Sequence, residues 1–526
     1  MHAPDDAAAG PLRDPVSRSE AATRLSPAPG PVLGPPGYLA PGARVRAAWP
    51  WWQRVLFRYA LLHAVLYMAP MPLSAFVQML IGLATRVDGW LAPDAAATAA
   101  AAEPSWLAST AVWLREHPAS WFAEVEQWWQ GATTWVAAQS WQQDVLGFEV
   151  LHQPTGSGDT GHHFVRLLLI VAASLLLTGV WSVLDRRRIG YRRLGRWLHL
   201  GARFYLGYWM LVYGGIKFYA GQFPEPGIAR LTNEIGDTSP MGMVWTFLGA
   251  SKPYEVFGGV CEALGGILLF HRRTALLGCF VTIATMTNVC ALNWMYDVPV
   301  KLFSTHLWLF AVALLAPWAK RLWALFVSNR PSEPVDLRVV HSAWLGWPLA
   351  VLGWFWVGGT LVTMHFGNVE AMERRADNAA KPALYGRWDV ERMLLDGEEV
   401  AAADASRWRF LAIDRGGRAF YRTAAGAQRS FSYAEDLAKG EITLTTASDA
   451  EPDARTLRVE QGTKTLAAPH PAPRTRQDFG ERVDAERRTL SLKGEWQGQL
   501  LELELVEHVF LLHRGFHWVQ EMPFNR

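Results

Sequence analysis

Charged residues occur inside two neighbouring apolar segments of the chain, both of which are candidates for crossing a membrane. Arg203 and Lys217 belong to one segment and are fourteen residues apart, about four helical turns, so they share a helix face. Glu255 and Glu262 belong to the next segment, are seven residues apart and also share a face. Because an ionised side chain is costly inside a bilayer, these residues need partners and are candidates for a functional site.

Further polar residues follow along the chain. Asn288 lies in the next apolar segment, Asp297 and Lys301 lie in the loop after it, and His306 opens the segment beyond. The predicted arrangement of the segments in the membrane brings most of these residues toward the outer face. The predicted polar pocket consists of Arg203, Lys217, Glu255, Glu262, Asn288, Asp297, Lys301 and His306.

Two interpretations of this polar pocket remain open. In the first, its residues are structural ion pairs and hydrogen bonds that fix a helix bundle. In the second, they bind a polar head group such as a quinone carbonyl, or they relay protons. Both are consistent with the residue types and their spacing.

Several other kinds of site are not indicated. The three cysteines form no CxxC pair, which argues against a disulfide framework, a structural zinc site and thiol-based quinone chemistry. The chain has no P-loop or HExxH motif and no recognisable Ser or Cys triad. The formal net charge of +2 gives no indication of nucleic-acid binding. We therefore expect no metal site and no nucleic-acid partner, and a quinone is the cofactor class that we consider.

A bis-histidine haem needs two histidines at one depth on facing helices. We place His306 and His365 toward the outer face, and His63 and His199 toward the other face. This distribution argues against haem.

Composition predicts a membrane protein. Of the 526 residues 50% are hydrophobic and 19% are charged, whereas a soluble protein has about 25% charged residues. The chain also has 27 Trp, a residue favoured at membrane interfaces. A spanning helix needs about 20 mostly apolar residues. Seven segments are candidates, the first with a kink at Pro70 and Pro72: 55–84, 164–184, 199–219, 254–271, 274–292, 303–318 and 343–366.

The positions of Lys and Arg predict the orientation. With seven spans, four basic clusters fall on one side, which becomes the cytoplasmic side. The C-terminal part then lies outside, in the periplasm of a bacterial inner-membrane protein. The clusters are Arg44, Arg46 and Arg54; Arg186–Arg188, Arg192, Arg193 and Arg196; Arg272 and Arg273; and Lys320 and Arg321.

The predicted outer loop 91–162 contains a regular row of tryptophans. They are separated by 7, 8, 7 and 7 residues, so they fall near one helix face. We expect one or two amphipathic helices on the membrane surface or over the bundle, with an ordinary packing stripe as the alternative to a substrate lid. The row consists of Trp106, Trp113, Trp121, Trp128 and Trp135.

The pattern changes after a polar linker at 367–383. Alternating apolar residues with Gly-containing turns predict a small antiparallel barrel or sandwich over 384–526. Strands are expected at 407–411, 442–445, 490–492, 500–505 and 509–512. The pairing of Gly386-x-Trp388 with a late Arg514 resembles the lipocalin pattern, in which an arginine packs on the first-strand tryptophan. An apolar interior would suit a ligand, and a filled one would suit a binding or packing module. We expect 513–526 to close the barrel or to dock on the bundle.

The segment from Leu198 to Trp318 resembles the DoxX family of four-helix membrane proteins. The resemblance is carried by Arg203, by Tyr213-Gly214-x-x-Lys217-Phe218, by Glu262 with Gly265-Gly266, by Asn288 and by Tyr296-Asp297-Val298-Pro299-Val300-Lys301. It implies a redox role with a quinone. The chain departs from the family pattern by two spans before this core, one span after it and the β domain.

These observations predict a membrane all-α bundle of about seven transmembrane helices followed by an antiparallel β domain. The expected parts are a disordered cytoplasmic arm at 1–50, two spans with the Trp-rich loop at 51–197, the DoxX-like core at 198–320, a linker and last span at 321–366, and the lipocalin-like domain at 384–526. Three functions remain open: a quinone-linked redox component, a non-enzymatic scaffold or assembly factor with a lipid or protein partner at the outer face, and a transporter of small molecules or lipids.

Overall fold

The computed structural model describes residues 48–91, 105–139, 158–219, 221–374, 381–446, 454–466, 485–510 and 512. The chain divides into two units, 1–49 and 50–526, and nearly all described residues belong to the second. Residues 1–47 of the predicted arm, most of the outer loop outside its helices, Arg514 and the C-terminal run 513–526 lie outside the described residues.

The first part of the second unit is helical. Helices follow one another along the described residues from Trp51 to Glu373. They are α1 (Trp51–Met68), α2 (Leu73–Leu91), α3 (Trp106–Glu116), α4 (Pro118–Ala137), α6 (Gly161–Leu184), α7 (Arg192–Phe218), α8 (Ile228–Leu231), α9 (Pro240–Gly249), α10 (Lys252–Phe270), α11 (Ala275–Met295), α12 (Lys301–Leu314), α13 (Ala319–Phe326) and α14 (Ala343–Glu373).

Six helical stretches among the described residues are long and apolar enough to cross a membrane. They are Trp51–Leu91, Gly161–Leu184, Lys252–Phe270, Ala275–Met295, Lys301–Phe326 and Trp344–Glu373. Each matches a predicted span. The remaining predicted span, 199–219, corresponds to α7, whose basic residues give it a lower hydropathy.

The break predicted at Pro70 and Pro72 is confirmed. Helix α1 ends at Met68 and α2 begins at Leu73, so the two prolines stand in the turn between them. Proline lacks the N–H that a continuing helix would need. The last helix is longer than predicted, because α14 continues to Glu373 and includes part of the predicted polar linker 367–383.

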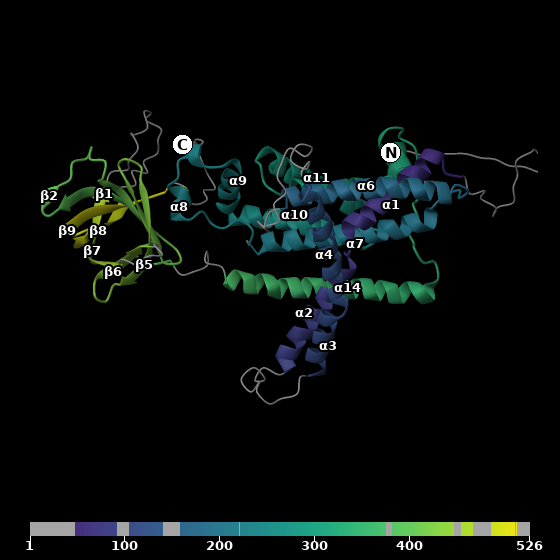
Figure 1. Cartoon of the computed structure of the whole chain (residues 1–526), viewed down its shortest axis with the longest axis horizontal. Helices are drawn as coiled ribbons and strands as arrows, with labels where there is room; N and C mark the ends of the chain where they lie inside the picture. Colours follow the sequence, from purple (N-terminus) through teal and green to yellow (C-terminus); the bar gives the residue numbers. More distant parts are fainter. Residues whose placement is uncertain are drawn as a thin grey trace, which may run out of the picture. The chain divides into compact units, whose positions relative to one another are not determined.

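Helices α7 and α10 pack closely side by side (Figure 1). Glycines make this possible: a Cβ added to Gly214 would lie 2.8 Å from the carbonyl oxygen of Gly259. A Cβ on Gly266 would lie 2.8 Å from the carbonyl oxygen of Gly207. Small residues let helix backbones approach to van der Waals contact, and this contact brings Lys217 of α7 within reach of α10.

The Trp-rich region forms the two helices α3 and α4, as predicted. The opposite face of α4 is buried at Trp129, Thr133 and Val136. The five tryptophans of the row are between 55% and 73% exposed, so they do not form a buried packing stripe against the described residues.

The C-terminal part is a closed antiparallel β-barrel of eight strands. The two-residue β2 pairs with β1 and is not one of these eight. Successive strands pair with one another, and β1 closes the circle by pairing with both β3 and β9 (Figure 1). The strands are β1 (Gly386–Leu395), β2 (Glu398–Glu399), β3 (Trp408–Asp414), β4 (Arg418–Thr423), β5 (Gln428–Asp436), β6 (Glu441–Thr446), β7 (Ala454–Leu466), β8 (Ala485–Trp496) and β9 (Gln499–His508).

The predicted β domain is therefore confirmed as a barrel. Four of the five expected strand segments fall in β3, β6, β8 and β9. The fifth, 509–512, is wrong, because β9 ends at His508 and Val509 and Phe510 follow it outside any strand.

The barrel interior is filled by its own side chains. Trp388, Trp408 and Trp496 are buried together with aliphatic and aromatic side chains from all eight strands. Trp408 stacks on Tyr421 with ring centroids 3.9 Å apart. Side chains of this size fill the lumen of a small barrel, which favours the packing alternative over a ligand chamber.

An arginine packs on the first-strand tryptophan, but it comes from β8. The guanidinium of Arg488 lies 5.1 Å from the Trp388 ring centroid. It also donates to the carbonyl oxygens of Ala383 and Tyr385 and pairs with Glu507. Arg488 thus has the role expected of Arg514.

Candidate functional site

Lys217 and Glu262 form a buried ion pair between α7 and α10. The Lys217 Nζ lies 2.8 Å from both carboxylate oxygens of Glu262. The two side chains are only 12% and 4% exposed, and Nζ also lies 5.8 Å from the Tyr213 ring centroid. The close approach of α7 and α10 at Gly214 and Gly259 brings the Glu262 carboxylate opposite Lys217. Each charge therefore neutralises the other.

Glu255, two turns before Glu262 on α10, holds the chain that follows α7. Its Oε1 accepts hydrogen bonds of 2.9 Å from the backbone N–H groups of Gln222 and Phe223. Its Oε2 lies 3.4 Å from Lys252 Nζ. The side chain is fully buried, and these contacts make Glu255 a backbone anchor.

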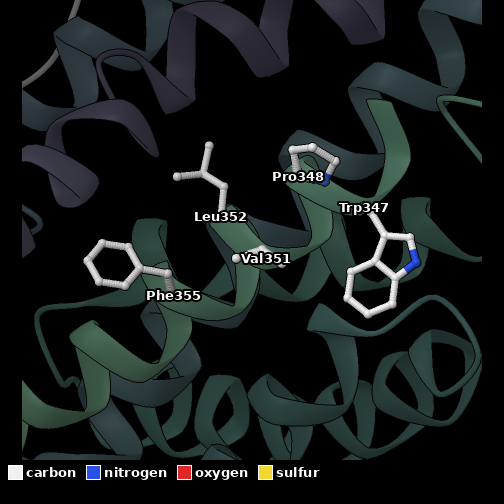
Figure 2. A pocket seen from close by; sticks show the side chains of 5 residues that line it. All are labelled: Trp347, Pro348, Val351, Leu352 and Phe355. Atoms are coloured by element: carbon white, nitrogen blue, oxygen red, sulfur yellow. The ribbon is translucent and has the colours of Figure 1, made fainter. Parts of the chain in front are cut away.

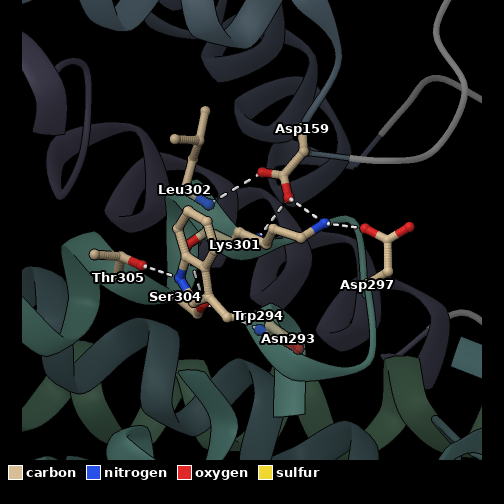
Figure 3. A network of polar contacts seen from close by, with 8 residues as sticks. All are labelled: Asp159, Asn293, Trp294, Asp297, Lys301, Leu302, Ser304 and Thr305. Atoms are coloured by element: carbon tan, nitrogen blue, oxygen red, sulfur yellow. Dashed lines mark hydrogen bonds and ion pairs between the residues drawn. The ribbon is translucent and has the colours of Figure 1, made fainter. Parts of the chain in front are cut away.

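Lys301 and Asp297 belong to a separate network at the start of α12 (Figure 3). The Lys301 Nζ lies 2.7 Å from Asp297 Oδ1 and 3.9 Å from Asp159 Oδ2. Asp159, which precedes α6, accepts from the backbone N–H groups of Lys301 and Leu302 at 2.6 and 3.0 Å. A carboxylate that accepts from a helix N-terminus satisfies donors that have no partner within the helix. Asp159 therefore joins α6 to α12.

His306 belongs to a stack of rings between α1 and α12. Its ring lies parallel to Tyr67, with centroids 4.0 Å apart, and 5.8 Å from the ring of His63. The His306 Nδ1 lies 2.7 Å from the carbonyl oxygen of Leu302. The predicted placement of His63 and His306 toward opposite faces is wrong, because His63 lies near the C-terminal end of α1, where its ring contacts that of His306.

Arg203 lies about 21 Å along α7 from Lys217, at 1.5 Å per residue. Its Nε and Nη2 donate to the carbonyl oxygens of Leu269 and Phe270 at 2.6 and 2.7 Å. These are among the last carbonyls of α10, which lack partners within the helix. Arg203 therefore bonds α7 to the C-terminal end of α10, far from the Lys217–Glu262 pair.

Asn288 does not point into any of these networks, because its side chain is exposed. The buried amide of α11 is instead Asn293, whose Nδ2 donates to Ser304 Oγ at 3.0 Å. The eight predicted residues are thus distributed over several local networks, and Asp159, Asn293 and Tyr67 are partners that the sequence did not indicate.

The connection between α7 and α10 (residues 219–251) contacts the barrel as well as the bundle. Glu225 pairs with Arg415 and lies 4.0 Å from Lys381. The Ala229 N–H donates to Asp414 at 3.3 Å, and Arg422 donates to the Thr232 carbonyl oxygen at 3.3 Å.

Apolar contacts accompany these bonds. Ile228 of α8 packs against Phe410, Ala412 and Phe420 on the outer wall of β3 and β4. This cover explains why β3 is buried on both faces. Gly227 is required here, because a Cβ would lie 2.8 Å from an Asp414 carboxylate oxygen.

Two cavities lie away from these polar networks. One, of about 570 Å³, is lined by apolar side chains of α14 (Figure 2). The other, of about 490 Å³, lies between α2 and α14. In the described part of the chain, no cluster of three or more His, Cys, Asp or Glu side chains is placed to hold a metal ion.

Comparison with known proteins gives one informative relative. The chain is 35% identical over 140 residues to the uncharacterized protein YwoB of Bacillus subtilis (strain 168). The similarity covers 26% of this chain and 85% of that protein. No protein-family model and no solved structure matches the chain.

Replacing Lys217 with Met leaves the Glu262 carboxylate buried without its cation. We expect the free energy of unfolding to fall by about 3–5 kcal/mol, the usual cost of breaking a buried pair from one side. The double variant Lys217→Met/Glu262→Leu removes both charges and should lose less than the sum of the single changes. Denaturant unfolding of the full chain in mild detergent measures this.

Lys252→Met is the matched control, because Lys252 is 42% exposed in its pair with Glu255 and its loss should cost less than Lys217→Met. Additive effects of the Lys217 and Glu262 changes would show that the two side chains are not coupled.

Proposed function

This chain belongs to the family of YwoB, and we propose that it is a non-enzymatic membrane scaffold that presents a β-barrel to a partner. The observation that carries the proposal is the α7–α10 connection, which is bonded to the helices on one side and to the barrel on the other. Such a double attachment is suited to holding a domain at the membrane.

The attachment to the helices is tight. Glu255 accepts from two backbone N–H groups of the connection, and Lys252 Nζ donates to the Phe223 carbonyl oxygen at 2.7 Å. A Cβ at Gly249 would lie 2.1 Å from the Pro224 carbonyl oxygen, so α9 also lies directly against this part of the connection.

The pairing of the charges supports a scaffold over a catalyst. Lys217, Glu255, Glu262 and Arg203 are each bonded to a neighbouring element of the same chain. The barrel interior is filled by Trp, Tyr and Leu side chains, so a partner of the barrel binds its outer surface. An isolated hairpin or helix cannot offer such a surface, whereas a closed barrel offers a rigid one.

We further propose seven spans in a bacterial inner membrane, with α7 as an interior helix, the N-terminus cytoplasmic and the barrel periplasmic. Contacts between the basic clusters support this arrangement. Arg54 donates to the carbonyl oxygens of Arg186 and Arg188, and Arg203 caps α10 immediately before Arg272. These clusters therefore lie at common ends of the helices, as the positive-inside rule requires.

The tryptophan row fits the same arrangement. Five exposed indoles lie along α3 and α4, and Arg166 pairs with Glu126 to attach α4 to α6. Indole rings are favoured where hydrocarbon meets water. We propose that α3 and α4 lie in the outer interface and brace the bundle there.

Cysteine labelling tests the orientation. Ser430 of the barrel and Ser332 between α13 and α14 are both exposed. With the outer membrane permeabilised, a membrane-impermeant maleimide should label Ser430→Cys in intact cells and Ser332→Cys only after lysis. The reverse pattern would contradict the orientation.

Changing Glu225 to Arg should loosen the connection from the barrel, because it replaces the ion pair with Arg415 by repulsion. We expect amide hydrogen exchange in 221–239 and in β3 to rise about two- to fivefold, which corresponds to about 0.5–1 kcal/mol for a partly exposed pair. The charge swap Glu225→Arg/Arg415→Glu should restore protection.

Glu234→Arg, an exposed change in the same connection, is the control and should leave exchange unchanged. Equal amide hydrogen exchange in wild type and Glu225→Arg would show that the Glu225–Arg415 pair does not hold the connection against the barrel.

A quinone-linked redox component, as the DoxX resemblance implies, is the second candidate. The ring stack of Tyr67, His63 and His306 favours it, because a quinone ring is planar and aromatic-like and its carbonyl oxygens accept hydrogen bonds. If the chain is a scaffold, we expect solvent extraction of the purified full chain to release far less than one quinone molecule per chain. About one quinone per chain, lost in His306→Ala and kept in Lys252→Met, would favour the redox function.

A further inference from the structure

Helices α2 and α14 form a V-shaped cleft. They touch at Gly82, where a Cβ would lie 2.9 Å from Thr363 Cγ2, and at Gly359, where it would lie 2.4 Å from Met79 Sδ. Two turns further along α2, a Cβ on Gly89 would meet nothing within 4 Å. The helices therefore diverge toward their C-terminal ends and leave a cavity of about 490 Å³.

Arg86 and Glu370 line this cleft, and Arg374 pairs with the same glutamate. Arg86 Nη1 lies 2.8 Å from Glu370 Oε1, and Arg374 Nη2 lies 3.4 Å from Glu370 Oε2. Two guanidinium groups thus share one carboxylate. The side chain of Arg86 is 23% exposed and that of Arg374 is 75% exposed, so both guanidinium groups can be reached from outside the helices.

Aromatic rings border the charged group. The Arg86 guanidinium lies 4.8 Å from the Phe366 ring centroid, and Trp90 meets the same ring edge-on at 5.6 Å. The hydroxyls of Thr85 and Thr363 donate to carbonyl oxygens of their own helices. The donors available to an anion are therefore those of the arginines, which match a phosphate in geometry as well as charge.

We propose that this cleft binds the phosphate headgroup of an anionic phospholipid, with its acyl chains along α2 and α14. The apolar surface that the chains need is present: Trp90 of α2 lines the cleft and is 64% exposed, and Val362 of α14 is 40% exposed next to Thr363. Basic pockets between transmembrane helices are suited to anionic headgroups. The inference is independent of the proposed scaffold function and requires only that these helices lie in a bilayer.

Native mass spectrometry of the full chain in mild detergent tests this, with phosphatidylglycerol as the titrant. Wild type should retain one phosphatidylglycerol molecule. Arg86→Gln should weaken its binding about tenfold or more, because a hydrogen-bonded charge is lost. Glu370 keeps Arg374 as a partner in this variant, so the carboxylate is not left unpaired.

Arg166→Gln is the matched control. Arg166 pairs with Glu126 at 2.6 Å, is 20% exposed and lies 5.3 Å from the Trp129 ring centroid, so its surroundings match those of Arg86. Its replacement should leave lipid binding unchanged. Equal binding in wild type and Arg86→Gln, or equal loss in both variants, would overturn the site.

Two further measurements separate the sources of the phosphate and guard against misfolding. Gly89→Leu fills the open cleft without a change of charge and should also abolish retention; unchanged retention would overturn the proposal. Glycerol 3-phosphate, which has the phosphate but no acyl chains, should not displace the lipid. Displacement at equal concentration would identify a free-phosphate site and overturn the lipid assignment.

Discussion

A buried charge in an apolar helix must meet a partner of opposite charge or bond to the backbone, and the helical part of this chain is arranged around that constraint. Lys217 is bonded to Glu262 in the interior, and Arg203 is bonded to the carbonyl oxygens that end α10. Both contacts need α7 and α10 to lie very close, and the glycines at 207, 214, 259 and 266 allow this. The charges and the glycines therefore depend on each other.

The same pair of helices also determines how the barrel is attached. Glu255 is a residue of α10, and its carboxylate accepts hydrogen bonds from the backbone N–H groups of Gln222 and Phe223. Two residues after Phe223 the chain reaches Glu225, which pairs with Arg415, and then α8, whose Ile228 covers the outer wall of β3 and β4. Only a few residues thus separate the contacts with the helices from the contacts with the barrel. In our proposal the polar residues stabilise the packing of the helices, and a partner binds the outer surface of the barrel.

The sequence predicted features that depend on local patterns. Apolar segment length located the six apolar helices, the spacing of the tryptophans predicted one or two helices where α3 and α4 lie, and alternation predicted a barrel or sandwich. The Lys217 and Glu262 positions were found because an ionised residue in an apolar segment is conspicuous. Asp159 and Arg488 were not found, because their partners are more than a hundred residues away or on a strand that has no special motif. The cover of β3 by α8 was missed for the same reason, since a four-residue helix leaves no periodic signal.

The central claim is that the α7–α10 connection holds the barrel in one position relative to the helices. It is tested most directly by an electron spin resonance distance measurement between labels at Ser430→Cys of the barrel and Met295→Cys at the end of α11. Both positions are exposed, and the three native cysteines would be replaced. In nanodiscs the account predicts a single narrow distance distribution. A broad distribution, as from a domain on a flexible tether, would contradict it.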